Sequence, residues 1–162
     1  MTKNGEREAN PAVIGKSVSG IHSFFKTLYL VLRKRLHLPK DRNGEVIKGS
    51  NGKEYVIFRG LTVDPKKNQP EKSGALLKLQ FNFKSGSARK NKRLSKIPIP
   101  FIAGLQGFRS KYWMIYEPSG GFQGIYEWDS VQDAENYKKS FAVKLLTKRA
   151  VPGSLNFEIV QN

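Results

Sequence analysis

The sequence predicts a small α+β domain in which four strands form one sheet covered by two helical segments. Three observations carry this prediction. Between residues 75 and 160, runs of alternating apolar and polar residues recur, segments of helical periodicity lie between them, and turn-forming residues separate the elements. The resulting order of elements is β-α-β-β-α-β.

The first 74 residues are expected to form an N-terminal extension that begins with a disordered segment and a helix. Residues 1–19 are polar with scattered glycine, proline and serine, which is typical of poorly ordered termini. Apolar side chains then recur at spacings of three and four, which predicts an amphipathic helix over residues 20–37. Its apolar stripe consists of Ile21, Phe24, Phe25, Leu28 and Leu32, and its last turn contains the cations Arg33, Lys34 and Arg35.

This stripe allows two interpretations. Apolar helix stripes are usually buried, so the helix is expected to pack on the body of the protein or on a second subunit. Bulky apolar residues flanked by cations also suit a helix that lies in the surface of an anionic membrane. The sequence leaves both open.

The rest of the extension is predicted to be a hairpin and a linker. The dipeptide Asn51-Gly52 separates two β-rich runs, which predicts a hairpin over residues 45–63. Residues 62–74 contain two prolines and many charges, and we expect them to link the extension to the domain of residues 75–162.

The elements of the domain follow in order. "ALLKLQFNFK", residues 75–84, alternates as a strand with one buried face, and residues 85–108 begin as a basic helix that breaks near Pro98 and Pro100. Residues 109–116 and 122–128 are two strands joined by a turn, and Ser130 is a suitable N-cap for the next helix. Residues 151–160 form the last strand. This order is that of the ferredoxin-like split βαβ fold.

The strand pairing predicts where the aromatic side chains lie. If "PSGG" spans the hairpin, Trp113 faces Tyr126 and Lys111 faces Trp128, and all four share one face of the sheet. The opposite face, with Tyr112, Met114 and Ile125, is then expected to pack beneath the helices. A free face with two tryptophans and a tyrosine is not left in water. We therefore expect a homodimer formed through the sheet face.

Composition excludes several classes of function. The 162 residues include 29 Lys+Arg, 13 Asp+Glu and no cysteine, for a formal net charge of +16. Disulfides and thiolate chemistry are therefore absent, and anionic partners are favoured. The longest apolar stretch near the N-terminus is too short to span a bilayer, so we expect a cytoplasmic protein, with peripheral membrane contact through residues 20–37 as an option. No metal-ligand cluster, phosphate loop or catalytic motif is evident.

The domain resembles a known family. "ALLKLQFNF" and "GGFQGIYEWDSVQDAENY", residues 121–138, resemble the YdhR-like mono-oxygenases of the dimeric α/β-barrel superfamily, over about residues 75–162. The resemblance implies a homodimer in which two sheets enclose a cavity for a small hydrophobic or aromatic compound. It further implies oxidation of that compound by oxygen without a cofactor. Haem-degrading relatives use a histidine, whereas His22 and His37, the only histidines here, lie in the extension.

Seven residues are candidates for the walls of this cavity. Without histidine, a general base would be a carboxylate or a lysine with a shifted pKa. Lys111, placed between tryptophans, could be desolvated and neutral, or could remain charged and bind an anion by cation–π contact. Gln80 and Asn82 could orient a substrate oxygen, and Arg109 could receive a carboxylate. Trp113, Tyr126 and Trp128 would complete the wall.

Two alternatives remain from other classes of protein. RNA-recognition motifs share the order of elements and stack bases on sheet aromatics, and "GFQGIYEW" echoes their third-strand signature. The spacing differs by one residue, however, and the first strand lacks the partner aromatic, so specific nucleic-acid binding is not expected. A membrane-surface binding protein without catalysis would use the same charge and the N-terminal helix.

Overall fold

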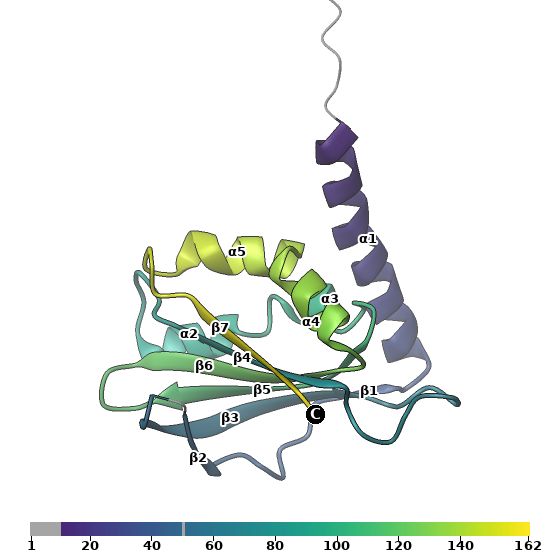
Figure 1. Ribbon diagram of the computed structural model, residues 1–162. Helices are drawn as coiled ribbons and strands as arrows, with labels where there is room; N and C mark the ends of the chain where they lie inside the picture. The colour runs from purple at the N-terminus through teal and green to yellow at the C-terminus, as the bar shows by residue number, and fades with distance from the viewer. Residues whose placement is uncertain (1–10, 50) are drawn as a thin grey trace, which may run out of the picture.

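The computed structural model describes residues 11–49 and 51–162, which form one antiparallel sheet with helices on one side of it (Figure 1). The strand order is β1-β3-β5-β6-β4-β7, and β2 also pairs with β3. The strands are β1 (Leu36–His37), β2 (Val46–Lys48), β3 (Glu54–Val63), β4 (Ala75–Phe81), β5 (Phe108–Tyr116), β6 (Gly121–Trp128) and β7 (Asn156–Gln161). The helices are α1 (Pro11–Leu32), α2 (Ala88–Leu94), α3 (Ile99–Ile102), α4 (Val131–Lys138) and α5 (Phe141–Arg149).

The second half of the chain has the predicted ferredoxin-like α+β fold. Its elements follow the order β4, α2–α3, β5, β6, α4–α5, β7, and its strands lie in the order β5-β6-β4-β7 within the sheet. The predicted hairpin of the extension is also present as β2 and β3, with Gly52 in its turn at a φ of 77°. Strand β3 pairs along β5 and so extends the sheet at that edge.

The helical segment after β6 differs from the prediction of one continuous helix. Ser130 caps α4 as expected, since its Oγ accepts a hydrogen bond from the backbone N of Asp133 at 3.1 Å. The helix stops at Lys138, and Ser140 then caps α5 by accepting from the backbone N of Val143 at 3.3 Å. A second good N-cap in the middle of the segment therefore turns one helix into two.

The hairpin register differs from the prediction by two residues, while the assignment of side chains to faces is confirmed. Lys111 pairs with Tyr126, and Trp113 pairs with Gly124. Side chains alternate between the faces with a period of two, so a shift of two residues keeps each one on its face. Lys111, Trp113, Tyr126 and Trp128 thus share one face of the sheet.

The predicted exposure of the two faces is wrong. Trp113, Tyr126 and Trp128 are buried in the main core together with residues of α3, α4 and α5, so the helices cover the aromatic face. Met114 belongs to a smaller cluster with Tyr55 and Ile57 on the opposite face. These aromatic side chains are thus buried within one chain, without a second subunit. The homodimer itself stays a prediction.

Helix α1 begins earlier and ends earlier than predicted. It runs from Pro11 to Leu32, so residues 11–19 are helical, whereas residues 1–10, also expected to be disordered, lie outside the described residues. The helix ends because Lys34 adopts a left-handed conformation with a φ of 54°, while the backbone N of Arg35 donates to the carbonyl of Leu30 at 2.9 Å. The chain then enters β1. In the part of the chain that the structure describes, no helix is long and apolar enough to cross a membrane.

The face by which α1 packs is not the predicted one. Among its residues from Gly20 onward, Ser23, Thr27 and Leu30 are buried. Ser23 Oγ donates to the carbonyl of Phe101 at 2.9 Å, and Thr27 Oγ1 donates to that of Pro100 at 2.8 Å. Every residue of the predicted stripe, from Ile21 to Leu32, is instead exposed. Two hydroxyl groups that bind free carbonyls of α3 therefore select the packed face.

Candidate functional site

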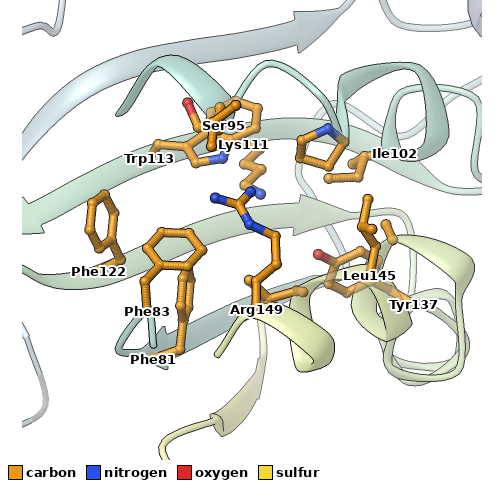
Figure 2. A pocket seen from close by; sticks show the side chains of 14 residues that line it. Phe81, Phe83, Ser95, Ile102, Lys111, Trp113, Phe122, Tyr137, Leu145 and Arg149 are labelled. Carbon is orange, nitrogen blue, oxygen red and sulfur yellow. The ribbon is translucent and has the colours of Figure 1, made fainter. Parts of the chain in front are cut away.

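A cavity lies between the sheet and the helices, on the aromatic face (Figure 2). The cavity volume is about 50 Å³, which is enough for only a few water molecules. Most of its walls are apolar and many are aromatic. The lining residues are Phe81, Phe83, Leu94, Ser95, Pro98, Ile102, Lys111, Trp113, Phe122, Tyr137, Ala142, Leu145, Leu146 and Arg149.

Lys111 is a charged residue type buried in this apolar wall. It is 5% exposed, and its Nζ lies 4.1 Å from the ring centre of Trp113 and 4.4 Å from that of Tyr126. Among the described residues, no carboxylate or hydrogen-bond acceptor contacts this amine. Burial lowers the pKa of Lys111 well below its ordinary value, because desolvation disfavours the ammonium form. The cavity therefore holds an amine with a raised fraction of the neutral form.

Strand geometry explains why the lysine points inward. Lys111 and Trp113 lie two residues apart on β5 and so face the same side as the helices. Across from Trp113, Gly124 leaves room for an aromatic ring, since a Cβ at Gly124 would lie 2.8 Å from Cε2 of Tyr126. The glycine thus allows the Tyr126 ring to lie over β6, where it contacts the amine of Lys111.

Behind Lys111 the aromatic side chains form a closed cluster. The rings of Tyr126 and Trp128 stack with their centres 6.4 Å apart, and the hydroxyls of Tyr126 and Tyr137 share a hydrogen bond of 2.8 Å. Burial raises the pKa of both phenols, so both stay protonated. The cluster fixes the wall on which Lys111 lies and supplies no phenolate.

Removing both paired hydroxyls should cost less stability than the sum of the losses from removing each one alone. Tyr137→Phe leaves the buried hydroxyl of Tyr126 without its partner, which typically costs about 1–3 kcal/mol. Tyr126→Phe should behave alike, while the double variant removes the unsatisfied group altogether. We expect the double variant to lose clearly less than the sum of the single losses in urea denaturation. Additive losses would show that the hydroxyl pair contributes nothing.

A second cation, Arg149, reaches the cavity from the end of α5. Its guanidinium lies 4.7 Å from the ring centre of Phe83, and its Nη2 donates to Oδ1 of Asn91 at 3.2 Å. Figure 2 shows its side chain extending across the cavity toward Lys111 and Trp113. Asn91 is buried and is held by the carbonyls of Ser85 and Gly86, so it fixes the arginine in turn. The lining contains no Asp or Glu within the described residues.

The structure brings together only part of the predicted set. Lys111 and Trp113 line the cavity, and Tyr126 and Trp128 lie directly behind them. Gln80 is on the opposite face of the sheet, where its Nε2 donates to Oε1 of Gln123 at 2.7 Å. Asn82 is likewise absent from the cavity lining, and its backbone N donates to Oγ of Ser154 at 3.2 Å.

Arg109 also lies outside the cavity. Its Nε donates to Oδ1 of Asp129 at 2.6 Å, and its Nη1 donates to the carbonyl of Glu71. A β-bulge between Phe108 and Ser110 interrupts the alternation at this end of β5, so spacing from Lys111 could not locate its side chain. The arginine links the segment before β4 to Asp129, the residue that follows β6, and it does not line the cavity.

Two cavity residues were not foreseen as site residues. Arg149 is one of several cations at the end of a helix, and nothing in the local sequence distinguishes it from Lys148. Tyr137 lies on α4 and was not among the predicted site residues. Its role could have been found if the aromatic face had been assigned to the helices.

In the described part of the chain, no group of three or more acidic or histidine side chains could hold a metal ion.

Comparison with known proteins supports the fold. A monooxygenase-like protein from Listeria innocua superposes with a TM-score of 0.50 at 14% identity, over 69% of this chain and 65% of that one, so this chain covers less than two thirds of that protein. A ferredoxin-fold protein from Listeria monocytogenes, related to antibiotic biosynthesis monooxygenases, superposes with a TM-score of 0.50 at 12% identity. The match covers 77% of this chain and 90% of that one. A major regulator of staphylococcal pathogenesis superposes with a TM-score of 0.52 at 11% identity, over 86% of this chain and 92% of that one.

These likenesses define the class of fold. No protein-family profile matches the chain, and no curated protein matches it in sequence. Sequence identities of 11–14% show a shared architecture and do not transfer an activity. The chain therefore has the ferredoxin-like fold found in monooxygenase-like proteins.

Proposed function

We propose that this protein binds a small aromatic compound with an acidic group in the cavity beside Lys111, and oxidises it with molecular oxygen without a cofactor, as a mono-oxygenase of the YdhR-like kind. The observation that carries the proposal is the unpaired amine of Lys111, buried against Trp113 in an otherwise apolar cavity. The sequence resemblance and the names of two Listeria proteins of the same fold support it.

The walls indicate the kind of ligand. Phe81, Phe83, Phe122 and Trp113 offer ring faces and edges to a planar apolar molecule. Arg149 brings a cation to a lining without a carboxylate, and Lys111 brings an amine that becomes cationic when it takes a proton, so an anionic group of the ligand completes the charge balance. Arg149 lies across the cavity, and a ring enters by displacing its long side chain.

Lys111 has the properties of a general base for such a ligand. A buried neutral amine can take the proton of a phenol, an enol or an acidic C–H group. The resulting ammonium is stabilised by the rings of Trp113 and Tyr126, at 4.1 and 4.4 Å, and by the new anion. Arg149 stabilises the anion from the other side. Proton transfer thus creates an ion pair in place of a lone buried charge.

The oxidation then needs only oxygen as co-reactant. A carbanion or enolate formed from an activated CH₂ group donates one electron to O₂, and the two radicals combine to a peroxide. Loss of water from the peroxide leaves a carbonyl group. The balance is CH₂ + O₂ → C=O + H₂O, in which one oxygen atom enters the product and the other leaves as water.

Binding of matched probes tests the proposal. We expect 2-naphthol, an acidic aromatic, to quench tryptophan fluorescence at concentrations at least about tenfold lower than its neutral analogue 2-methoxynaphthalene does, since a charge-assisted contact contributes about 1.5–3 kcal/mol. Oxygen uptake is measured separately with 2-indanone, whose CH₂ groups are acidic. Equal binding of the two naphthalenes would overturn the proposed site. Selective binding without uptake of oxygen would overturn the oxidation alone.

The RNA-binding alternative loses its central feature. Base stacking needs exposed aromatic side chains on the sheet. Trp113, Tyr126 and Trp128 are each at most 4% exposed and lie beneath the helices. These three residues therefore cannot serve as a stacking platform in this fold.

A further inference from the structure

The outer side of α1 is an apolar surface that other elements of the described chain leave open. We name it the α1 apolar face, and its large exposed side chains are Ile21, Phe25, Leu28, Tyr29, Val31 and Leu32. Phe25 is 61% exposed and Leu32 is 73% exposed. Phe24 lies at the border of this face and contacts Phe101, with the ring centres 6.2 Å apart. Contiguous apolar surface of this kind marks an interaction site.

The orientation of the helix is the reverse of ordinary packing. Its small polar side chains Ser23 and Thr27 bind the body through α3, whereas its bulky apolar side chains point outward. With 3.6 residues per turn, positions 21, 25, 28 and 32 lie on the side roughly opposite positions 23, 27 and 30. The hydrogen bonds of Ser23 and Thr27 to α3 hold the helix in this orientation, so its apolar side faces outward.

Charge around the helix identifies the partner. Residues 11–40 contain six Lys or Arg and no Asp or Glu. Arg33 and Lys34 follow the helix directly and are exposed, and Arg33 also lies 5.8 Å from the ring centre of Tyr29. A bulky apolar face bordered by cations is the pattern of a helix that lies in an anionic lipid surface. A second copy of this chain fits less well, because each copy carries a formal charge of +16.

We infer that α1 docks the protein on an anionic membrane, with the α1 apolar face inserted among the lipids and the ferredoxin-like domain held above them. The position of the helix permits this arrangement. α1 lies at the edge of the molecule, and its N-terminal part projects past α5 (Figure 1). The α1 apolar face runs over residues 21–32, about 18 Å of helix at 1.5 Å per residue, which gives an extended line of insertion. This inference is independent of the cavity and its chemistry.

Vesicle binding of two charge-matched variants tests the inference. The full chain is sedimented with phosphatidylcholine vesicles, with and without phosphatidylserine. Phe25→Asp/Leu32→Asp changes two exposed residues of the α1 apolar face, and Val46→Asp/Ile97→Asp changes two exposed apolar residues elsewhere by the same charge. We expect binding to anionic vesicles that weakens at least about tenfold in the first variant and less than about twofold in the control.

Thermal denaturation checks that both variants fold, and all four residues are exposed, so little change is expected. Failure of the unaltered chain to bind anionic vesicles would overturn the inference. Equal losses in both variants would do so too, since net charge alone would then explain binding. If the unaltered chain is an oligomer without lipid and Phe25→Asp/Leu32→Asp is a monomer, the face belongs to a second copy.

Discussion

Replacing Lys111 by methionine is expected to make the protein more stable and to abolish its preference for acidic aromatic ligands. The side chain is 5% exposed and has no carboxylate partner in the described chain. Methionine keeps an unbranched apolar stem of similar length and removes the buried polar group. A buried polar group without a hydrogen bond typically costs about 1–3 kcal/mol, so we expect a gain of that order in urea denaturation.

The gain should depend on pH in a defined direction. Because burial lowers the pKa of Lys111 in the folded state, the unfolded chain binds more protons at this position between the folded and the unfolded pKa. The unaltered protein therefore loses stability relative to Lys111→Met as pH falls below the ordinary lysine value of 10.5. The difference should be larger at neutral pH than well above pH 10.5, where the amine is neutral in the unfolded chain as well as in the folded protein.

A surface lysine provides the control for this comparison. Lys78 lies on the opposite face of the sheet and forms an ion pair with Glu158 at 3.1 Å, so Lys78→Met should change stability by less than about 1 kcal/mol. A lower melting temperature of Lys111→Met, or unchanged selectivity for 2-naphthol, would contradict the role proposed for the amine. A residue that weakens the fold while serving ligand binding is common at functional sites.

The second large effect is expected from Gly104→Ala, which should separate α1 from the body. A Cβ at Gly104 would lie 2.0 Å from the carbonyl oxygen of Ser23, a backbone atom that cannot move alone. The helix must shift, and the contacts of Ser23 and Thr27 with α3 are strained or lost. Overpacking of this kind costs about 1–3 kcal/mol. The measurement is thermal denaturation together with hydrogen exchange of the α1 amides.

Gly20→Ala is the matched control within α1. Its Cβ would lie 3.5 Å from Cβ of Phe141, which is an ordinary contact. Alanine is also the better helix former by about 0.5–1 kcal/mol, so this variant should melt at the same temperature or higher. If Gly104→Ala left stability and α1 exchange unchanged, the close approach of α1 to Gly104 would not hold the helix in place.

Sequence patterns predicted the architecture because each element leaves a local signal. Alternation in residues 75–83, the break at Pro98 and Pro100, and the cap at Ser130 each depend on neighbours within a few positions. Even the face shared by Lys111 and Trp113 follows from the period of a strand. The lowered pKa of Lys111 was likewise foreseen as one of two options, from its aromatic neighbours alone.

The covered face of the sheet could not be predicted in the same way. Both faces of the β5–β6 hairpin carry apolar side chains, Trp113 and Tyr126 on one and Met114 and Ile125 on the other. On the face away from the helices, Met114 packs with Tyr55 and Ile57 of β3, a strand that lies far from β5 in the sequence. The site residue Arg149 was missed for the same reason, since it reaches the cavity only through the position of α5.

Helix α1 shows a second limit of periodicity. A stripe of Ile21, Phe24, Phe25, Leu28 and Leu32 indicates a helix with one apolar side, and the helix is present. The stripe does not say which side meets the body. Two hydroxyl groups of α1 donate hydrogen bonds to carbonyls of α3 and so fix the packed side. The spacing of apolar residues within one helix does not predict such contacts between distant segments.

Most ladders of the sheet join segments that are distant in the chain. Ile57 pairs with Met114, and Leu77 pairs with Ile159, whereas only the β2–β3 and β5–β6 pairs are closed by short loops. Closing long loops costs entropy before the pairing compensates for it, which makes folding slow. On the ribosome, β4 therefore keeps an unpaired edge until β7, about 80 residues further along the chain, has been synthesised. The complete ferredoxin-like sheet can form only after residues 156–161 have been added.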